Sequence, residues 1–180
     1  MRSLRGQLLV AGPALEDPNF RRTVVLVGEH GDEGAMGIVL NRASAVLVDD
    51  AVPVISSLAG PDQAVYLGGP VQPQAVVVLA DFADPEEANL VVDSVGFLPG
   101  EIEDVGQLGE LRRVRVFAGY AGWAPGQLEG ELDEGSWIVL DARASDVFTD
   151  APELLWREVL RRGGPAHSVL ALLPDDPRVN

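Results

Sequence analysis

The sequence has 180 residues, of which 47% are hydrophobic and 23% charged, the balance of a folded globular protein rather than of a disordered chain. It contains no cysteine, which excludes disulfides, thiolate nucleophiles and cysteine-ligated metal centres. Its formal net charge of −15 would repel a phosphate backbone and therefore argues against direct nucleic-acid binding.

All 13 basic residues are arginine, so a P-loop lysine, a Schiff-base lysine and a lysine general base are excluded as well. The longest apolar run, residues 75–80, is far shorter than the roughly 20 residues that cross a bilayer. The apolar part of the N-terminus is brief and is broken by Gly12 and Pro13, which predicts a first strand rather than a signal peptide. We therefore expect a cytoplasmic protein without a membrane segment.

Short strands separated by turns are predicted in the first part of the chain. Residues 8–11 form an apolar strand, and residues 24–28 and 36–40 are β-branched runs on either side of a polar glycine loop, which predicts a hairpin. Because both runs are almost continuously apolar, both faces of this hairpin should be covered. A short helix is expected over residues 49–58, interrupted by Pro53, which a helix tolerates only in its first turn.

Strand patterns continue through the middle of the chain. Residues 65–67 form a strand that runs into a bend at residues 68–70. Residues 76–79 form a buried strand, which is followed by an acidic loop or the start of a short helix over residues 81–87. Residues 90–108 contain only short strand-like pieces.

The C-terminal third mixes strands and helices. The alternation of Val114, Val116 and Ala118 predicts a strand that leads into a glycine-rich run. A helix is expected from Pro125 to a stop at Gly135, followed by a strand over residues 137–140. A last helix should extend from a capping box at residues 150–153 to Gly163, and the tail after it should dock on the domain.

Together these elements predict one domain spanning residues 1–180. Short strands with hairpin-like connections and few helices are typical of the α+β class. We expect a single mixed, largely antiparallel sheet that curls and carries two to four helices.

The glycine-rich run GYAGWAPGQLEGE, residues 119–131, is the most distinctive segment. A strand, then glycines, then a helix is a layout that can place backbone N–H groups around an anion. The spacing is not that of a dinucleotide-binding fingerprint, and Glu129 and Glu131 would compete with a phosphate for the helix dipole. The favoured interpretation is structural: the glycines let backbone pass closely under Tyr120 and Trp123, whose rings fill the gap, with a ligand or partner pocket as the alternative.

Other candidate groups are sparse. His30 is expected in the hairpin loop beside Glu29, Asp32 and Glu33, as a solvated histidine or, alternatively, as an acid/base group or one metal ligand. Carboxylate clusters at residues 81–87 and 129–134 are expected to form solvated faces, with weak Mg²⁺ binding as the alternative. No nucleophile motif of the GxSxG type and no HExxH helix occurs.

The run FAGYAGWAPGQLE, residues 117–129, resembles the signature of the YqgE/AlgH family of bacterial proteins. Similar stretches are LRGQLLVAGPALEDPNFRRTVVLV, EHGDEGAMGIVLNR, YLGGPVQP and LLPDDPRVN, so the resemblance covers nearly the whole chain. It implies a compact α+β fold whose sheet closes partly like a barrel, flanked by helices. One branch of this family is named a transcriptional regulator of exopolysaccharide synthesis, without a DNA-binding module.

The leading functional hypothesis is a non-enzymatic binding or regulatory module, with an influence on transcription that is indirect. We expect no catalytic residue, no metal and no cofactor; the partner is a protein or a small molecule of unknown identity, and the oligomeric state is not indicated. The residues predicted to bind the ligand or partner are Asn41, Arg42, Gly68, Gly69, Tyr120, Gly122, Trp123, Gln127 and Glu129.

Two alternatives stay open. The first is a metal-dependent hydrolase or transferase that uses Glu129 and Glu131 with His30 nearby. The second is direct regulation at DNA, which requires a basic surface patch and a steep salt dependence.

Overall fold

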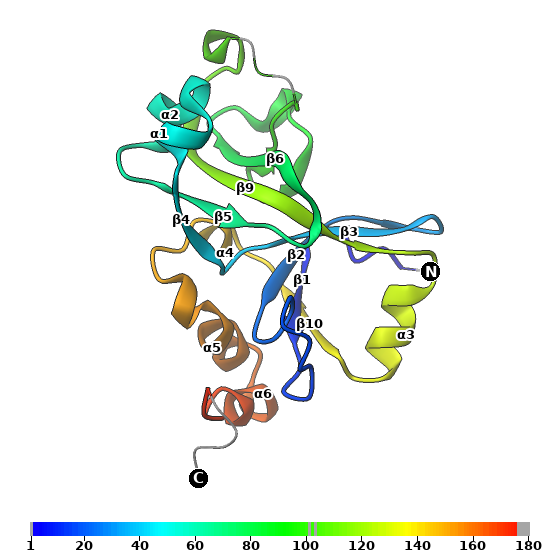
Figure 1. Cartoon of the computed structure of the whole chain (residues 1–180). Helices are drawn as coiled ribbons and strands as arrows, with labels where there is room; N and C mark the ends of the chain where they lie inside the picture. The colour runs from blue at the N-terminus through cyan, green and yellow to red at the C-terminus, as the bar shows by residue number, and fades with distance from the viewer. Residues whose placement is uncertain (1, 101, 103, 176–180) are drawn as a thin grey trace.

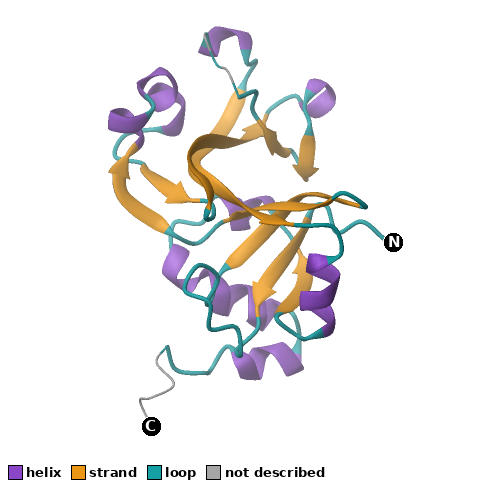
Figure 2. Cartoon of the chain, turned by 45° about the vertical axis from the view of Figure 1, so that its right-hand side comes forward, coloured by secondary structure: helices purple, strands orange, loops and turns teal. Residues whose placement is uncertain are grey.

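The computed structural model describes residues 2–100, 102 and 104–175. The chain forms a single α+β domain, in which a curled, largely antiparallel sheet makes a half-barrel flanked by helices (Figures 1 and 2). The fold class expected from the sequence is therefore confirmed. Over the described residues there are six α-helices, of which α1 and α4 are only four residues long.

The strands are β1 (Gln7–Ala11), β2 (Val24–Gly31), β3 (Gly34–Val39), β4 (Ala43–Leu47), β5 (Ala64–Leu67), β6 (Val71–Phe82), β7 (Leu90–Val92), β8 (Val95–Phe97), β9 (Leu111–Trp123) and β10 (Trp137–Asp141). The α-helices are α1 (Val48–Ala51), α2 (Pro53–Ala59), α3 (Gln127–Asp133), α4 (Ala144–Val147), α5 (Pro152–Arg162) and α6 (Pro165–Leu170). Two short 3₁₀ helices are η1 (Pro85–Glu87) and η2 (Val105–Gln107).

Strand β9 joins the two parts of the sheet, whose order is β10-β1-β2-β3-β9-β6-β8-β7. The C-terminal end of β9 pairs with β3, and its longer N-terminal part pairs with β6. Strand β5 pairs in parallel with β9, and β4 pairs antiparallel with β5. In Figure 1, β9 crosses the molecule from the side of α1 and α2 to the side of α3.

Both faces of the N-terminal half-sheet are buried, as the apolar runs predicted. Along β1, Leu8 and Val10 pack in a cluster that includes Trp156 of α5. The intervening Leu9 points to the opposite face, in a cluster that includes Leu128 of α3. A third cluster lies under α1 and α2, between β5, β6 and the N-terminal part of β9.

The hairpin and the glycine-rich run differ from the sequence-based expectation. Strands β2 and β3 extend until only Asp32 and Glu33 separate Gly31 from Gly34, so His30 lies in a strand opposite Ala35. Its side chain is only 3% exposed, and the solvated loop histidine expected above is wrong. Strand β9 likewise continues through the first glycines to Trp123, because its end pairs with β3.

Two smaller expectations are also wrong. Asp81 belongs to β6 and is buried rather than lying in a loop, whereas Pro85–Glu87 form η1, the short helix expected as the alternative. Helix α5 begins after Ala151 without a side-chain cap, so the expected capping box does not form. None of the helices in the described part of the chain is long and apolar enough to cross a membrane.

Candidate functional site

The nine residues predicted to bind a ligand or partner lie at three places in the fold. Gly68, Gly69 and Tyr120 lie where the β5–β6 connection crosses β9. Gly122, Trp123, Gln127 and Glu129 lie at the end of β9 and in α3. Asn41 and Arg42 follow β3 and hold the loop before β2.

At the crossing, glycines let two backbone segments touch. A Cβ on Gly69 would lie 2.1 Å from the carbonyl carbon of Tyr120, and one on Gly68 would lie 2.3 Å from the carbonyl oxygen of Gly119. Gly119 itself has φ +71, in the left-handed region that favours glycine. The close contact occurs where β9 leaves β6 and begins to pair with β3, so these three glycines position the two parts of the sheet.

Gly122 is different from its neighbours. It is exposed, and a Cβ there would make only ordinary contacts, with Val71 Cγ2 at 3.6 Å and Tyr120 Cε2 at 3.9 Å. Tyr120 is half-buried and lies opposite Val71 in the sheet. Nothing in the packing explains why residue 122 is a glycine.

Glu131 is the centre of a hydrogen-bonded cluster under α3. Its Oε2 accepts the indole N–H groups of Trp123 at 2.9 Å and Trp137 at 2.8 Å, and its Oε1 accepts the amide of Gln127 at 2.9 Å. Both indole rings are buried, and Phe20 packs against both of them. Three donors on one carboxylate fix α3 against the end of β9 and against β10.

His30 and Glu129 form a second link between the hairpin and α3. His30 Nδ1 accepts the backbone N–H of Leu4 at 2.9 Å, so in the neutral ring Nε2 carries the proton and donates to Glu129 Oε1 at 2.7 Å. This hydrogen bond lowers the pKa of Glu129 below its ordinary value.

The hydrolase alternative needs carboxylates and a histidine that converge on one ion. Glu131 already accepts three donors, and Glu129 faces His30 at its Oε1. Over the part of the chain that the structure describes, no group of three or more His, Asp or Glu side chains is arranged to hold a metal ion. The arrangement around α3 therefore links elements of the fold by hydrogen bonds.

Asn41 and Arg42 shape the loop that connects β1 to β2. Asn41 Oδ1 accepts the backbone N–H of Val24 at 2.9 Å, and its Nδ2 donates to the carbonyl of Arg22 at 2.9 Å. Arg42 donates to the carbonyls of Pro18 at 2.8 Å and Arg21 at 3.1 Å. Burial lowers the pKa of Arg42. These contacts hold Arg22 at φ +55, a conformation that a non-glycine residue adopts only when its surroundings impose it.

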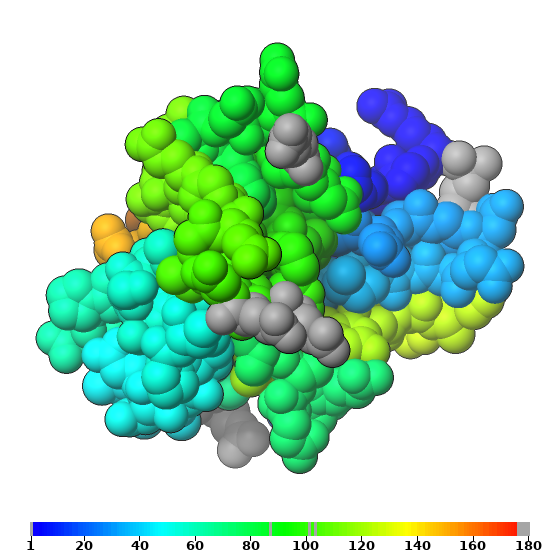
Figure 3. Space-filling view, turned by 90° about the horizontal axis from the view of Figure 1, so that it is seen from above, coloured from blue at the N-terminus to red at the C-terminus, as the bar shows by residue number. Residues whose placement is uncertain are grey.

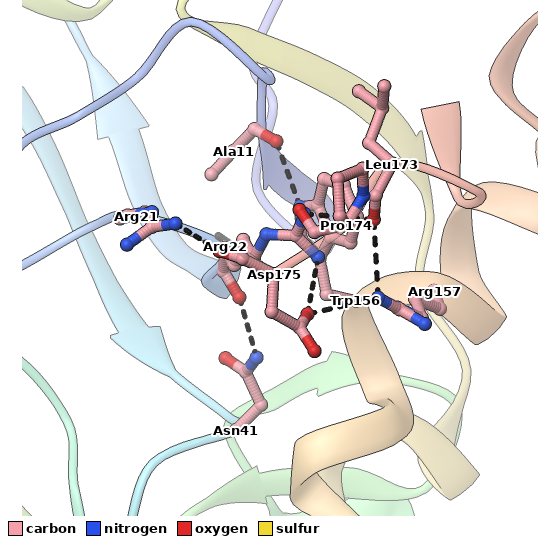
Figure 4. Close-up of polar contacts among 9 residues, drawn as sticks. All are labelled: Ala11, Arg21, Arg22, Asn41, Trp156, Arg157, Leu173, Pro174 and Asp175. Atoms are coloured by element: carbon pink, nitrogen blue, oxygen red, sulfur yellow. Dashed lines mark hydrogen bonds and ion pairs between the residues drawn. The ribbon is translucent and has the colours of Figure 1, made fainter. Parts of the chain in front are cut away.

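The loop presents its arginines to the C-terminal segment (Figure 4). Arg22 Nη1 donates to Asp175 Oδ1 at 2.8 Å, and Arg157 Nη2 donates to the same oxygen at 3.0 Å. Arg21 donates to the backbone carbonyl of Asp175, and Arg22 Nη2 donates to the carbonyls of Leu173 and Pro174. Three arginines thus bind the carboxylate of Asp175 and the backbone carbonyls of residues 173–175. We call Arg21, Arg22 and Arg157 the arginine cluster.

Trp156 forms the base of the arginine cluster. The guanidinium of Arg22 lies over its ring at 4.4 Å, and its indole N–H donates to the carbonyl of Ala11 at 2.9 Å (Figure 4). Burial lowers the pKa of Arg22, while the charge of Asp175 raises it. In the sequence, the signals for this cluster are the acidic tail and the Arg21-Arg22 pair. Arg22 and Asp175 are 153 positions apart, so no local pattern links them.

Comparisons with known proteins agree over nearly the whole chain. A sequence profile described as AlgH-like matches residues 8–168. The chain belongs to the AlgH-like family. A UPF0301 protein of Streptomyces avermitilis is 45% identical over 185 residues, which cover 99% of this chain and 96% of the relative. A UPF0301 protein of Chlorobaculum tepidum is 38% identical over 180 residues, which cover 97% and 95%.

Two solved structures share the fold of this chain. The crystal structure of DIP2367 from Corynebacterium diphtheriae superposes with a TM-score of 0.87 at 29% identity and covers 96% of this chain and 94% of that one. The solution structure of AlgH from Pseudomonas aeruginosa superposes with a TM-score of 0.71 at 28% identity and covers 98% and 100%. The resemblance inferred from the glycine-rich run is therefore confirmed.

Proposed function

We propose that this AlgH-like protein is a non-enzymatic binding module that recognises an acidic, extended segment of a partner protein at the arginine cluster. The observation that carries this proposal is the way in which Arg21, Arg22 and Arg157 hold residues 173–175 of the chain itself. In this proposal the C-terminal segment is an internal ligand, and a partner segment of the same chemistry competes with it.

The exposure of the contacts supports this interpretation. The side chain of Asp175 is 82% exposed, so its carboxylate meets the arginines at the surface, where a second chain has access. The side chains of Arg22 and Arg157 are much less exposed, at 22% and 30%, and Arg22 is fixed between the ring of Trp156 and the backbone contacts of Asn41. A preorganised guanidinium loses little conformational entropy when it binds a carboxylate.

The proposal gives Asn41 and Arg42 the role of positioning the loop that carries Arg21 and Arg22. It assigns the cluster around Glu131 to stability, because the side chains there bond to one another. A regulatory effect on transcription would be exerted through the partner protein, since the net charge of −15 disfavours DNA.

The experiment is a binding titration with a fluorescent peptide of sequence LLPDD, followed by anisotropy, on the wild type and three full-length variants. Arg22→Gln removes the charge-assisted hydrogen bonds of the central arginine to Asp175, Leu173 and Pro174, so it should weaken binding by at least about tenfold, the effect of losing one such bond. Asp175→Asn weakens the internal ligand and should tighten peptide binding about threefold. Arg161→Gln, an equal charge change on the exposed part of α5, is the matched control and should leave the affinity unchanged.

The opposite effects of the first two variants separate recognition from damage to the fold. Binding should weaken as salt is raised, because the contacts lie at the surface. The proposal fails if no saturable binding appears at about millimolar peptide, a range of weak affinity, or if Arg22→Gln and Arg161→Gln change it equally.

A further inference from the structure

A second group of arginines lines a hollow beside the N-terminal part of β9, away from the arginine cluster. The hollow has a volume of about 360 Å³ and lies between the C-terminal end of α2 and the start of β9. Figure 3 shows these segments side by side, α1 and α2 in cyan and the region before and at the start of β9 in yellow-green. Its polar lining includes Gln63, Arg112, Arg113, Arg115 and Asp150.

Arg115 is the most constrained of the three arginines. It is only 7% exposed, its guanidinium lies 4.4 Å over the ring of Tyr66, and its Nη1 donates to the carbonyls of Val147 at 3.2 Å and Thr149 at 2.6 Å. Neither Nε nor Nη2 donates to another described residue, yet no fully buried side-chain nitrogen of the described residues lacks a partner. Arg115 lines the hollow, and Nε and Nη2 are the donors that it does not use toward another described residue.

Arg113 repeats the arrangement at the surface. Its guanidinium lies 4.4 Å over the ring of Phe148, which covers one face, and the side chain is 49% exposed, so the N–H groups that do not bond to Asp81 are accessible. Arg112 and Arg113 both contact Asp81, at 3.1 and 3.4 Å. Burial raises the pKa of Asp81, but the Ser94 hydroxyl and the two arginines outweigh it and hold this pKa below its ordinary value.

Charge favours an anion in this hollow, in a protein that is otherwise strongly acidic. Three arginines line it against a single carboxylate, Asp150, and Asp81 lies behind two of them. Burial lowers the pKa of Arg115, which means that its charged form is poorly solvated and would gain from a bound anion.

We propose that the hollow is a binding site for a small molecule that carries a phosphate group, held by the N–H edges of Arg113 and Arg115. Guanidinium edges match the oxygens of a phosphate in paired hydrogen bonds. The size of the hollow suits a metabolite, and the acidic surroundings disfavour a polyanion such as nucleic acid. This site shares no residue with the arginine cluster, so it stands or falls independently of the proposed function.

The test is a titration with inorganic phosphate, followed by heteronuclear NMR and calorimetry on the full chain, with ionic strength held constant by sodium chloride. We expect saturable binding of one phosphate, with shifts concentrated in the amides of residues 57–63 and 113–115. Arg113→Gln should weaken binding about tenfold, and its fold should survive because Asp81 keeps Arg112 and Ser94. Arg161→Gln, outside the hollow, should bind phosphate as the wild type does.

Asp150→Asn is the variant that decides the test, because it removes the one carboxylate among the residues that line the hollow. We expect it to tighten phosphate binding about threefold, a gain that a misfolded protein cannot produce. A dicarboxylate, succinate, distinguishes a phosphate site from a general anion site, and binding of succinate as tight as that of phosphate would overturn the assignment. The proposal is also overturned if chloride produces the same shifts as phosphate, or if Asp150→Asn leaves the affinity unchanged.

Discussion

His30 Nε2 lies 2.7 Å from Glu129 Oε1, a contact between residues 99 positions apart that ties the β2–β3 hairpin to α3. The histidine is buried and the carboxylate is about one-third exposed. Because Leu4 donates to the other ring nitrogen, the tautomer of His30 is set by its surroundings. The hydrogen bond lowers the pKa of Glu129 below its ordinary value of 4.5.

This contact makes part of the stability depend on pH. A carboxyl group whose pKa is lower in the folded state stabilises the fold above its unfolded pKa, and this contribution is lost as the pH falls through the folded pKa. Glu129→Gln keeps an acceptor for His30 but cannot titrate. We therefore expect the variant to unfold at lower urea than the wild type at pH 6 and the difference to disappear as the pH falls below the folded pKa of Glu129. A difference that is constant from pH 6 to pH 3 would contradict this.

The Glu131 carboxylate should contribute strongly to the stability of the fold, because it accepts hydrogen bonds from two buried indole groups. Glu131→Ala leaves the indole N–H groups of Trp123 and Trp137 without their acceptor in a buried setting. We expect a loss of about 2–4 kcal/mol in the free energy of unfolding, since hydrogen bonds to charged groups contribute about 1.5–3 kcal/mol each and are not additive.

Urea denaturation followed by far-UV circular dichroism measures this loss, and avoids a signal from the two tryptophans themselves. Glu134→Ala is the matched control: it lies three residues along and is exposed, so its effect should stay within about 0.5 kcal/mol. Equal effects of the two variants would mean that the cluster contributes nothing beyond its charge.

The sequence predicted the parts of the fold that local patterns determine. The apolar runs of β1, β2 and β3 indicated strands covered on both faces, and Gly135 and Gly163 mark the ends of α3 and α5 correctly. Each of these signals lies within a few residues of the structure that it predicts. The bend at Gly68 and Gly69 was likewise visible in the sequence.

Contacts between distant segments were not predictable in this way. His30 looked like a loop residue because polar and glycine residues surround it, whereas pairing with β3 extends β2 past it. The extension of β9 through Gly119 depends on a strand more than 80 residues away. The predicted binding residues are separated for the same reason: Gly119, one of the glycines that suggested an anion-binding loop, is needed where two backbones cross, and only the folded chain shows that crossing.

The two kinds of glycine can be told apart by substitution. Gly69→Ala would place a methyl group 2.1 Å from the Tyr120 backbone at φ +153, so we expect the protein not to fold or to lose more than about 4 kcal/mol. Gly130→Ala lies in α3 with open space around it, and alanine is favoured over glycine in a helix, so it should gain about 0.5–1 kcal/mol. Thermal unfolding of both variants measures the contrast; a folded Gly69→Ala protein of wild-type stability would refute the close crossing.

The buried ion pair between Asp146 and Arg162 offers a test of how the C-terminal helices are held. Asp146 is 3% exposed; its oxygens accept Arg162 Nη1 and Nη2 at 2.8 and 2.7 Å, and Oδ2 also accepts the backbone N–H of Arg143 at the start of α4. The hydrogen bond to Asp146 raises the pKa of Arg162. Arg162→Leu leaves a buried carboxylate without its partner and should cost about 3–5 kcal/mol.

Adding Asp146→Asn to Arg162→Leu removes the charge while keeping an acceptor for Arg143. The double variant should therefore be more stable than Arg162→Leu alone, because a neutral amide tolerates burial better than an unpaired charge. Urea denaturation of the two single variants, the double variant and the wild type completes a double-mutant cycle. If the two single losses simply add in the double variant, the charges do not interact and α5 is held by its apolar face alone.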